Sequence, residues 1–196
     1  TVPRARPFIH QTMTSLLQAD NTLSPFLPIY FFIDSDQIDF VERYRQVAQN
    51  VFLGAPELEI RKQWKDVRLA VLYNYWRCLH HFHASDKKLL ICEDDISFAP
   101  DWLKKISPIL DQIESEIGPK FILTLYSPYD WPQVMGEDQS PYIVMKKVGF
   151  YGTQAVLFSS QARIIAEKYL WDQGIVKLKV PADLLIRDCC IEEGIP

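Results

Sequence analysis

The chain has 196 residues, of which 48% are hydrophobic and 23% are charged, and its net charge is −4. This length suits one domain with a sizeable core, and the composition argues against a disordered chain. The negative balance argues against nucleic acid as a partner, because phosphate backbones are bound chiefly through clustered Lys and Arg.

The first half of the chain alternates between predicted helices and apolar strands. The expected elements are a helix at 8–19, a strand at 28–34, an exposed helix at 37–50, the longest helix at 57–82 and a strand at 87–94. In the first helix, Phe8, Met13, Leu16 and Leu17 fall on roughly one face. The longest helix is predicted because apolar residues recur at spacings of three and four without Gly or Pro.

The second half contains more strands. The expected elements are a helix from Pro100 to Gly118 with a kink or break at Pro108, strands at 121–127, 142–148 and 155–159, and helices at 161–170 and 182–194. Residues 127–141 are rich in Pro, Gly and Asp and are predicted to form a long loop. The alternation along the chain predicts a sheet covered by helices and at least partly parallel.

Metal binding through Cys or His has little support. The four cysteines show no CxxC spacing. His80 and His83 share a helical face but have no assigned third ligand, and His81 points about 100 degrees away from His80. These histidines are therefore predicted to be surface or packing residues. No apolar run reaches the roughly 18 residues of a membrane span, and no signal peptide is visible.

An apolar strand at 89–92 is followed by three carboxylates, Glu93, Asp94 and Asp95. Adjacent like charges repel unless solvent or a cation compensates them. Two interpretations follow: a hydrated turn before a helix capped by Ser97 or Asp101, or a prepared site for a divalent cation. The very apolar strand favours the cation site, because the carboxyl ends of strands border the ligand crevice in such folds.

Several segments, in order along the chain, resemble glycosyltransferases of the GT-A fold, most closely the group around N-acetylglucosaminyltransferase IV with its bacterial and fungal relatives. These segments are TVPR (1–4), TMTSLL (12–17), FFIDSD (31–36), the helix with Arg68, LLICEDDISFAPDWLKKI (89–106) and VPADLLIRDCC (180–190). The acidic triplet, Glu93 to Asp95, is the most specific part of this resemblance.

The resemblance implies one GT-A-like, Rossmann-like α/β domain over residues 1–196, with a mixed, mostly parallel sheet flanked by helices. Residues 1–100 would form the nucleotide-binding half and 101–196 the acceptor-side half. Family members have a strand before the TVPR-like loop, and a strand and a metal-ligating histidine after the last helix. Compared with them, this sequence looks trimmed at both ends.

By the same resemblance, Glu93, Asp94 and Asp95 take the part of the DxD motif. Asp95 would be the direct ligand of a Mn²⁺ or Mg²⁺ ion on the diphosphate of a UDP-sugar. Glu93 would lie nearest the ribose or the donor sugar, with Asp94 between them. A divalent cation suits this chemistry because the leaving group is a nucleoside diphosphate.

Further nucleotide contacts are implied for Arg4, Asp34 and Arg68. Asp34 matches an acidic residue available to the uracil base. Arg4 and Arg68 would neutralise diphosphate oxygens, since guanidinium suits bidentate phosphate contact. An exposed surface role is equally open for each arginine.

Catalysis and acceptor binding are implied for residues of the second half. Asp183 is the candidate base that takes the proton of the acceptor hydroxyl, and its alternative is a favourable charge in the first turn of a helix. Tyr129 and Trp131 in the long loop are candidate platforms for the acceptor sugar, or else anchors of the loop.

The expected function is a metal-dependent, inverting glycosyltransferase that moves a sugar, N-acetylglucosamine from a UDP donor, to a glycan hydroxyl. One rival is a transferase-like module that binds a nucleotide or glycan without turnover. A magnesium-dependent phosphohydrolase fits the order of the carboxylates poorly. Membrane contact is expected only through segments outside this sequence. The expected compartment is the Golgi lumen for a eukaryotic source, and the cytoplasm or inner membrane face for a bacterial one.

Overall fold

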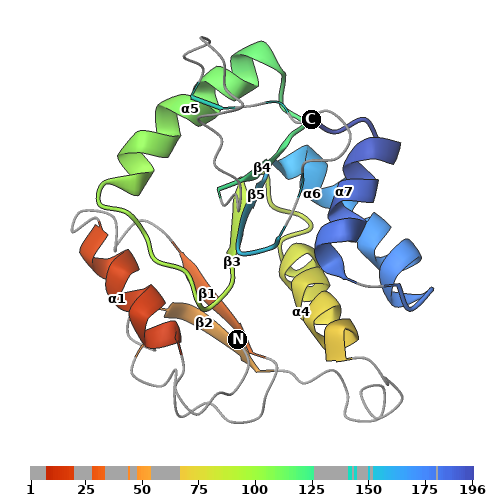
Figure 1. Cartoon of the computed structure of the whole chain (residues 1–196), viewed down its shortest axis with the longest axis horizontal. Coiled ribbons are helices and arrows are strands. Elements are labelled where there is room, and N and C mark those ends of the chain that lie inside the picture. The colour runs from red at the N-terminus through yellow and green to blue at the C-terminus, as the bar shows by residue number, and fades with distance from the viewer. Residues whose placement is uncertain are drawn as a thin grey trace.

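A computed structural model of the chain describes residues 8–19, 28–33, 44, 48–53, 67–125, 141–142, 144, 150, 152–179 and 181–196 (Figure 1). The helices are α1 (Ile9–Ala19), α4 (Val67–His81), α5 (Trp102–Glu116), α6 (Ser160–Tyr169), the π-helix η2 (Leu170–Ile175) and α7 (Ala182–Glu192). The strands are β1 (Ile29–Ile33), β2 (Ala48–Leu53), β3 (Leu89–Cys92), β4 (Ile122–Thr124) and β5 (Ala155–Phe158).

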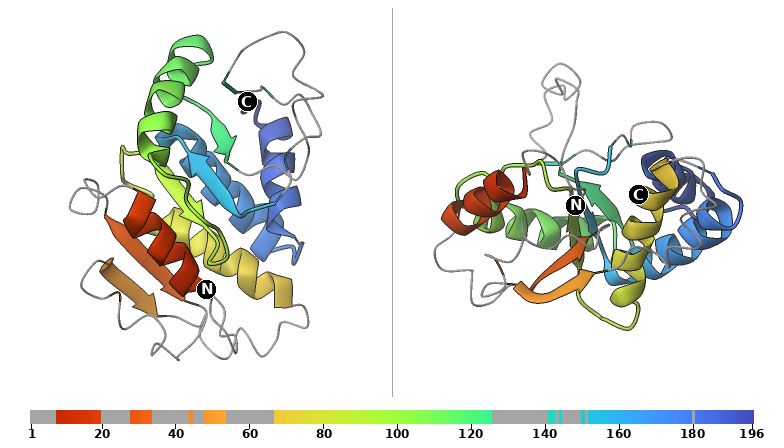
Figure 2. Two further views of the ribbon diagram at one scale, coloured as in Figure 1. Left: turned by 60° about the vertical axis from the view of Figure 1, so that its left-hand side comes forward. Right: turned by 90° about the horizontal axis from the view of Figure 1, so that it is seen from below.

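The described strands form two sheets. β1 and β2 pair in parallel, next to α1 (Figure 2). The other sheet has the order β3-β5-β4, and both of its pairings are antiparallel. The expected α/β class is confirmed, but the described strands do not form a mostly parallel sheet. The reason is that β5 enters between β3 and β4, which run in one direction and are connected through α5.

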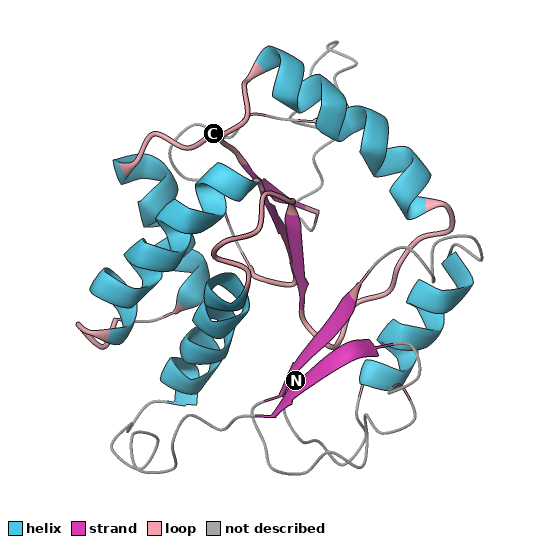
Figure 3. Ribbon diagram, turned by 180° about the vertical axis from the view of Figure 1, so that it is seen from behind, coloured by secondary structure: helices cyan, strands magenta, loops and turns pink. Residues whose placement is uncertain are grey.

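Helices cover both faces of the three-stranded sheet, with α5 on one side and α4, α6 and α7 on the other (Figures 1 and 3). Successive side chains of a strand point to opposite faces, and the buried strand β5 supplies both cores. Val156 and Phe158 pack into the core of α4, α6 and α7. Leu157 packs against Ile113 of α5 and Phe121. Each such side chain contributes about 1.5–3 kcal/mol when fully buried.

Within the described residues, most predicted elements are confirmed by α1, β1, α4, β3, α5, β4, β5, α6 and α7. Helix α6 begins at Ser160, one residue before its predicted start, and Ser159 caps it by accepting a hydrogen bond from the backbone N–H of Ala162. Helix α5 continues through Pro108, so of the predicted kink or break, a break is excluded. Gly118 follows this helix with a φ of 105°, a left-handed conformation that suits glycine.

Other predictions need correction. Residues 48–50 belong to strand β2 and not to a helix. Tyr142 and Val144 lie outside any strand. Of the predicted apolar face of the first helix, Met13 is buried and Leu16 and Leu17 are partly buried, but Phe8 is exposed. Thr12 is buried as well, and its hydroxyl contacts the Asp94 carbonyl. The remaining residues of the expected helix at 37–47, of 57–66, and of the loop at 127–140 lie outside the described residues, except Tyr44, which lies in a turn.

Within the described part of the chain, no helix is both long and apolar enough to cross a membrane.

Candidate functional site

The acidic triplet lies at the carboxyl end of β3, beside the segment that leads into β5. Cys92 pairs with Ala155, so antiparallel pairing places Glu93 next to residues 153 and 154. The backbone N–H of Glu93 donates to the carbonyl of Gln154 at 2.8 Å. The Thr153 hydroxyl donates to Glu93 Oε1. Glu93 is thereby oriented by main-chain pairing and by one side-chain hydrogen bond.

The next two carboxylates differ in exposure. Asp94 is buried and Asp95 is exposed, and both lie in a turn. The hydroxyl of Thr12, from α1, lies 2.8 Å from the Asp94 carbonyl and 2.7 Å from the Ile96 carbonyl. Because a hydroxyl has one proton, the two carbonyls share it. The Thr12 side chain of α1 therefore holds the main chain of this turn. The Asp95 side chain in the same turn is exposed.

The capping interpretation of this segment is not supported at Asp101. Asp101 occupies the N-cap of α5, but its side chain makes no capping hydrogen bond and its φ is 56°. Its carboxylate instead pairs with Lys104 in the first turn of the helix, at 3.3 Å. The helix start is attached through main chain, since the Asp101 N–H donates to the Ala19 carbonyl at 2.9 Å.

Asp183 lies at the second position of α7, as the sequence predicted. Its Oδ1 accepts from the N–H of Leu184 at 2.9 Å, and its Oδ2 accepts from the N–H of Gly152 at 3.4 Å. Gly152 has a φ of 81°, which L-residues rarely adopt, and a Cβ there would lie 2.1 Å from Gln154 Oε1. The positive φ therefore favours glycine at the point where the segment 152–154 meets Asp183.

Residues 152–154 thus contact two of the predicted site carboxylates, Glu93 through Thr153 and Asp183 through Gly152. Reasoning from sequence missed Thr153. The signal for it in the sequence was a polar residue directly after Gly152 and shortly before the apolar strand at 155–158. Asp183 lies in the first turn of α7, as its alternative role requires, and its role as a base stays a prediction.

The core beside the triplet is apolar and keeps its ionisable groups neutral. Tyr75 of α4 is buried, and its hydroxyl has no hydrogen-bond partner among the described residues. Burial raises the pKa of Tyr75 well above its ordinary value, and the nearby Cys78, Cys92 and Glu93 raise it further. Burial also raises the pKa of Cys92 to about 12. Glu93 therefore lies between this apolar core and the polar segment 152–154.

The other predicted site residues are distributed as follows. Arg68 is the second residue of α4 and is exposed. Arg4, Asp34, Tyr129 and Trp131 lie outside the described residues. Within the described ranges, no group of three or more His, Cys, Asp or Glu side chains is arranged to hold a metal ion. Asp95 as the ligand of a divalent cation stays a prediction.

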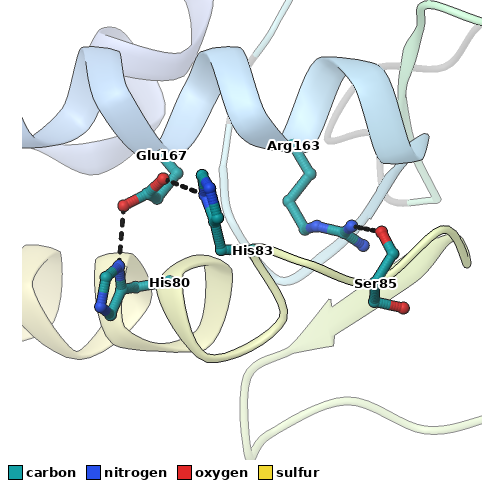
Figure 4. Close-up of polar contacts among 5 residues, drawn as sticks. All are labelled: His80, His83, Ser85, Arg163 and Glu167. Carbon is teal, nitrogen blue, oxygen red and sulfur yellow. Dashed lines mark hydrogen bonds and ion pairs between the residues drawn. The ribbon is translucent and has the colours of Figure 1, made fainter.

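The histidines at the end of α4 form a separate polar cluster (Figure 4). His80 Nδ1 lies 2.9 Å from Oε1 of Glu167, which belongs to α6, and His83 Nδ1 lies 2.9 Å from Oε2 of the same carboxylate. The side chains of His80 and His83 are 59% and 55% exposed, whereas that of Glu167 is 13% exposed. The same helix carries Arg163, which contacts the Ser85 carbonyl. These contacts agree with the surface and packing roles predicted for the two histidines.

No protein-family model, curated protein or solved structure matches the chain, so its chemistry has to be argued from the residues of the site.

Proposed function

We propose that this protein is a metal-dependent, inverting glycosyltransferase that moves a sugar from a UDP donor, with N-acetylglucosamine as the expected sugar, to a glycan hydroxyl. One observation carries the proposal: Glu93 and Asp183, 90 positions apart in the sequence, both contact the segment 152–154. Donor binding and proton abstraction need separate carboxylates near one another. Glu93 and Asp183 meet this need because each contacts the segment 152–154.

The exposed Asp95 is the proposed ligand of Mn²⁺ or Mg²⁺. These cations prefer oxygen ligands and are often held by one or two carboxylates together with phosphate oxygens. The bound cation would stabilise the negative charge that develops on the departing diphosphate. Thr12 fixes the backbone of the turn that bears Asp95, through the carbonyls on either side of it.

Asp183 is the proposed base. A base must lie within hydrogen-bond reach of the acceptor hydroxyl and keep a defined orientation. The backbone N–H groups of Gly152 and Leu184 supply that orientation, one to each carboxylate oxygen. Each oxygen has a second lone pair that can accept the proton of the acceptor.

The GT-A architecture is part of this proposal. The connection from β3 through α5 to β4, with the two strands running in one direction, is a crossover of the kind found in Rossmann-like sheets. The strands β1 and β2, in the proposed nucleotide-binding half, also pair in parallel. Arg4, Arg68 and Asp34 remain the proposed nucleotide contacts, and Tyr129 and Trp131 the proposed acceptor contacts.

The test is calorimetric titration of UDP in Mn²⁺ and then in EDTA, followed by transfer assays with a panel of UDP-sugars. Binding is expected only with Mn²⁺ and is expected to be lost in Asp95→Ala. Asp183→Asn should keep UDP binding and lose about 10²–10⁴-fold in transfer rate. Asp101→Asn removes an exposed carboxylate of the same connecting segment and serves as the matched control.

Two results would contradict the proposal. If both Asp95→Ala and Asp183→Asn transferred sugar at the parental rate, neither carboxylate would have its proposed role. Metal-dependent UDP binding without transfer from any donor sugar would instead support the binding module without turnover.

A further inference from the structure

The turn that follows η2 exposes apolar and basic side chains together. Val176 and Leu178 are 62% and 59% exposed, the two largest exposures among the described large hydrophobic residues. Lys177 and Lys179 alternate with them and are also exposed. Trp171 of η2 is 39% exposed and packs with one side against Trp76. In Figures 1 and 3 this turn, between η2 and α7, lies at the outer edge of the molecule.

The backbone holds this arrangement in place. Leu178 has a φ of 55°, a left-handed conformation that is strained for a leucine and in which glycine is usual after a helix. Hydrogen bonds on either side fix it: the Val176 N–H donates to the Trp171 carbonyl and the Lys179 N–H to the Gly174 carbonyl, each at 3.0 Å. These hydrogen bonds therefore hold Leu178 in a conformation that glycine would adopt without strain, with its apolar side chain exposed to solvent.

The local positive charge of the turn indicates a negatively charged partner. The chain has a net charge of −4, yet residues 173–181 contain two lysines and no acidic residue. The nearest acidic residue in the sequence, Asp172, pairs with Lys168. Exposed aliphatic side chains, lysines and a tryptophan at the edge together match the boundary between headgroups and acyl chains of an anionic bilayer. Lysine stems can lie along apolar surface while their ammonium groups reach phosphates.

We propose that Trp171 and the turn 176–179 form a peripheral contact with anionic lipid surfaces. This contact is independent of the proposed transfer reaction and uses residues of the described chain, so it would revise the expectation that membrane contact lies only in other segments. The two apolar side chains would enter the interface and the two lysines would pair with lipid phosphates. Trp171 would lie at headgroup level.

The test is cosedimentation of the protein with vesicles of equimolar phosphatidylcholine and phosphatidylserine, compared with vesicles of phosphatidylcholine alone. Lys177→Gln with Lys179→Gln should weaken binding to the anionic vesicles by about fivefold per lysine. Val176→Gln with Leu178→Asn should weaken it by about tenfold or more. Asparagine tolerates the left-handed conformation at 178, so this variant keeps the turn. Ile191→Gln replaces an exposed apolar residue at the far end of α7 and is the control.

A second readout identifies the part of the molecule that meets the lipid. Lipids brominated on the acyl chain should quench the tryptophan fluorescence of the parent, and Trp171→Phe should remove most of that quenching. Failure of the parent to bind anionic vesicles, or equal binding by all variants, would overturn the proposal. Self-association of the parent that both double variants abolish, without lipid binding, would assign the turn to a second copy and would equally overturn it.

Discussion

The two ends of strand β3 are held in different ways. At the amino end, residues 80–88 are fixed by two charged side chains of α6. Arg163, which is 1% exposed, donates to the carbonyls of Lys87, at 2.7 Å, and of Ser85. Glu167 accepts from both His80 and His83. The charged groups of α6 are thus engaged by the protein itself.

At the carboxyl end, the chain is held mainly through its backbone. Neutral hydroxyl groups and main-chain atoms make the contacts, as with Thr12 to the Asp94 carbonyl and Ser15, which accepts from the Phe98 N–H at 2.9 Å. Thr153 orients Glu93, and Asp95 is left at the surface. Buried charge from α6 thus holds the amino end of β3, whereas hydroxyl groups and main-chain atoms orient the turn after its carboxyl end, where Asp95 is exposed.

Replacing Arg163 should have the largest effect on this contrast. In Arg163→Met, the carbonyls of Ser85 and Lys87 lose their donor at a buried site, and the free energy of unfolding should fall by about 2–4 kcal/mol. Urea unfolding followed by circular dichroism measures the change. Lys168→Met, an exposed position of the same helix, is the control and should leave the midpoint unchanged. Because Arg163 acts at the amino end, the folded variant should bind UDP and Mn²⁺ like the parent. A midpoint equal to that of the parent would mean that these hydrogen bonds contribute no net stability.

Replacing Thr12 should act at the other end. Thr12→Val keeps a similar shape but removes the proton shared by the Asp94 and Ile96 carbonyls, and this should cost about 1–2 kcal/mol. Thr14→Val, an exposed threonine of the same helix, is the matched control. If the proposed function is right, Thr12→Val should also weaken UDP binding in Mn²⁺, measured by calorimetry, because the turn that bears Asp95 is less well fixed. Equal UDP affinity in the two threonine variants would separate this turn from nucleotide binding.

Local sequence pattern predicted the elements around β3 well, and the long-range pairings poorly. Strands β3 and β5 follow from short apolar runs, and α6 lies within one residue of its predicted bounds. The position of β5 between β3 and β4 depends on which strands pair, and the apolar pattern of a buried strand carries no information on that. The burial of Thr12 escaped prediction for a similar reason, since its carbonyl partners lie 82 and 84 residues away.

The candidate site was predicted in the same uneven way. An apolar strand that ends in three carboxylates is visible in the sequence, whereas the proposed role of Asp183 came only from the resemblance. No pattern relates Asp183 to Glu93, because their connection passes through Gly152 and Thr153, far from both in sequence. Glu167 was missed as the partner of the histidines, because it lies 87 residues from His80 and 84 from His83.

The smallest expected effect concerns the thiol next to the acidic triplet. Burial raises the pKa of Cys92 from 9.0 to about 12. Above pH 9 the unfolded chain loses this proton while the folded chain keeps it, so stability is full below pH 9 and falls as the pH rises towards 12. The slope for one thiol is at most about 1.4 kcal/mol per pH unit. Unfolding free energies measured by urea at pH 8 and pH 10 should therefore differ by about 1 kcal/mol less in Cys92→Ala than in the parent.

Cys92→Ser separates titration from packing in this experiment, because it removes the thiol but keeps a small polar side chain. Both variants should show the same reduction in pH dependence, although their stabilities at pH 8 will differ. Cys78, whose pKa burial also raises to about 12, remains in both variants and keeps part of the alkaline loss. If neither variant changed the pH dependence, the Cys92 thiol would ionise in the folded chain as it does in the unfolded one. Water would then reach the Cys92 thiol as well as the exposed Asp95. The two ends of β3 would in that case differ more in their access to water than the described contacts indicate.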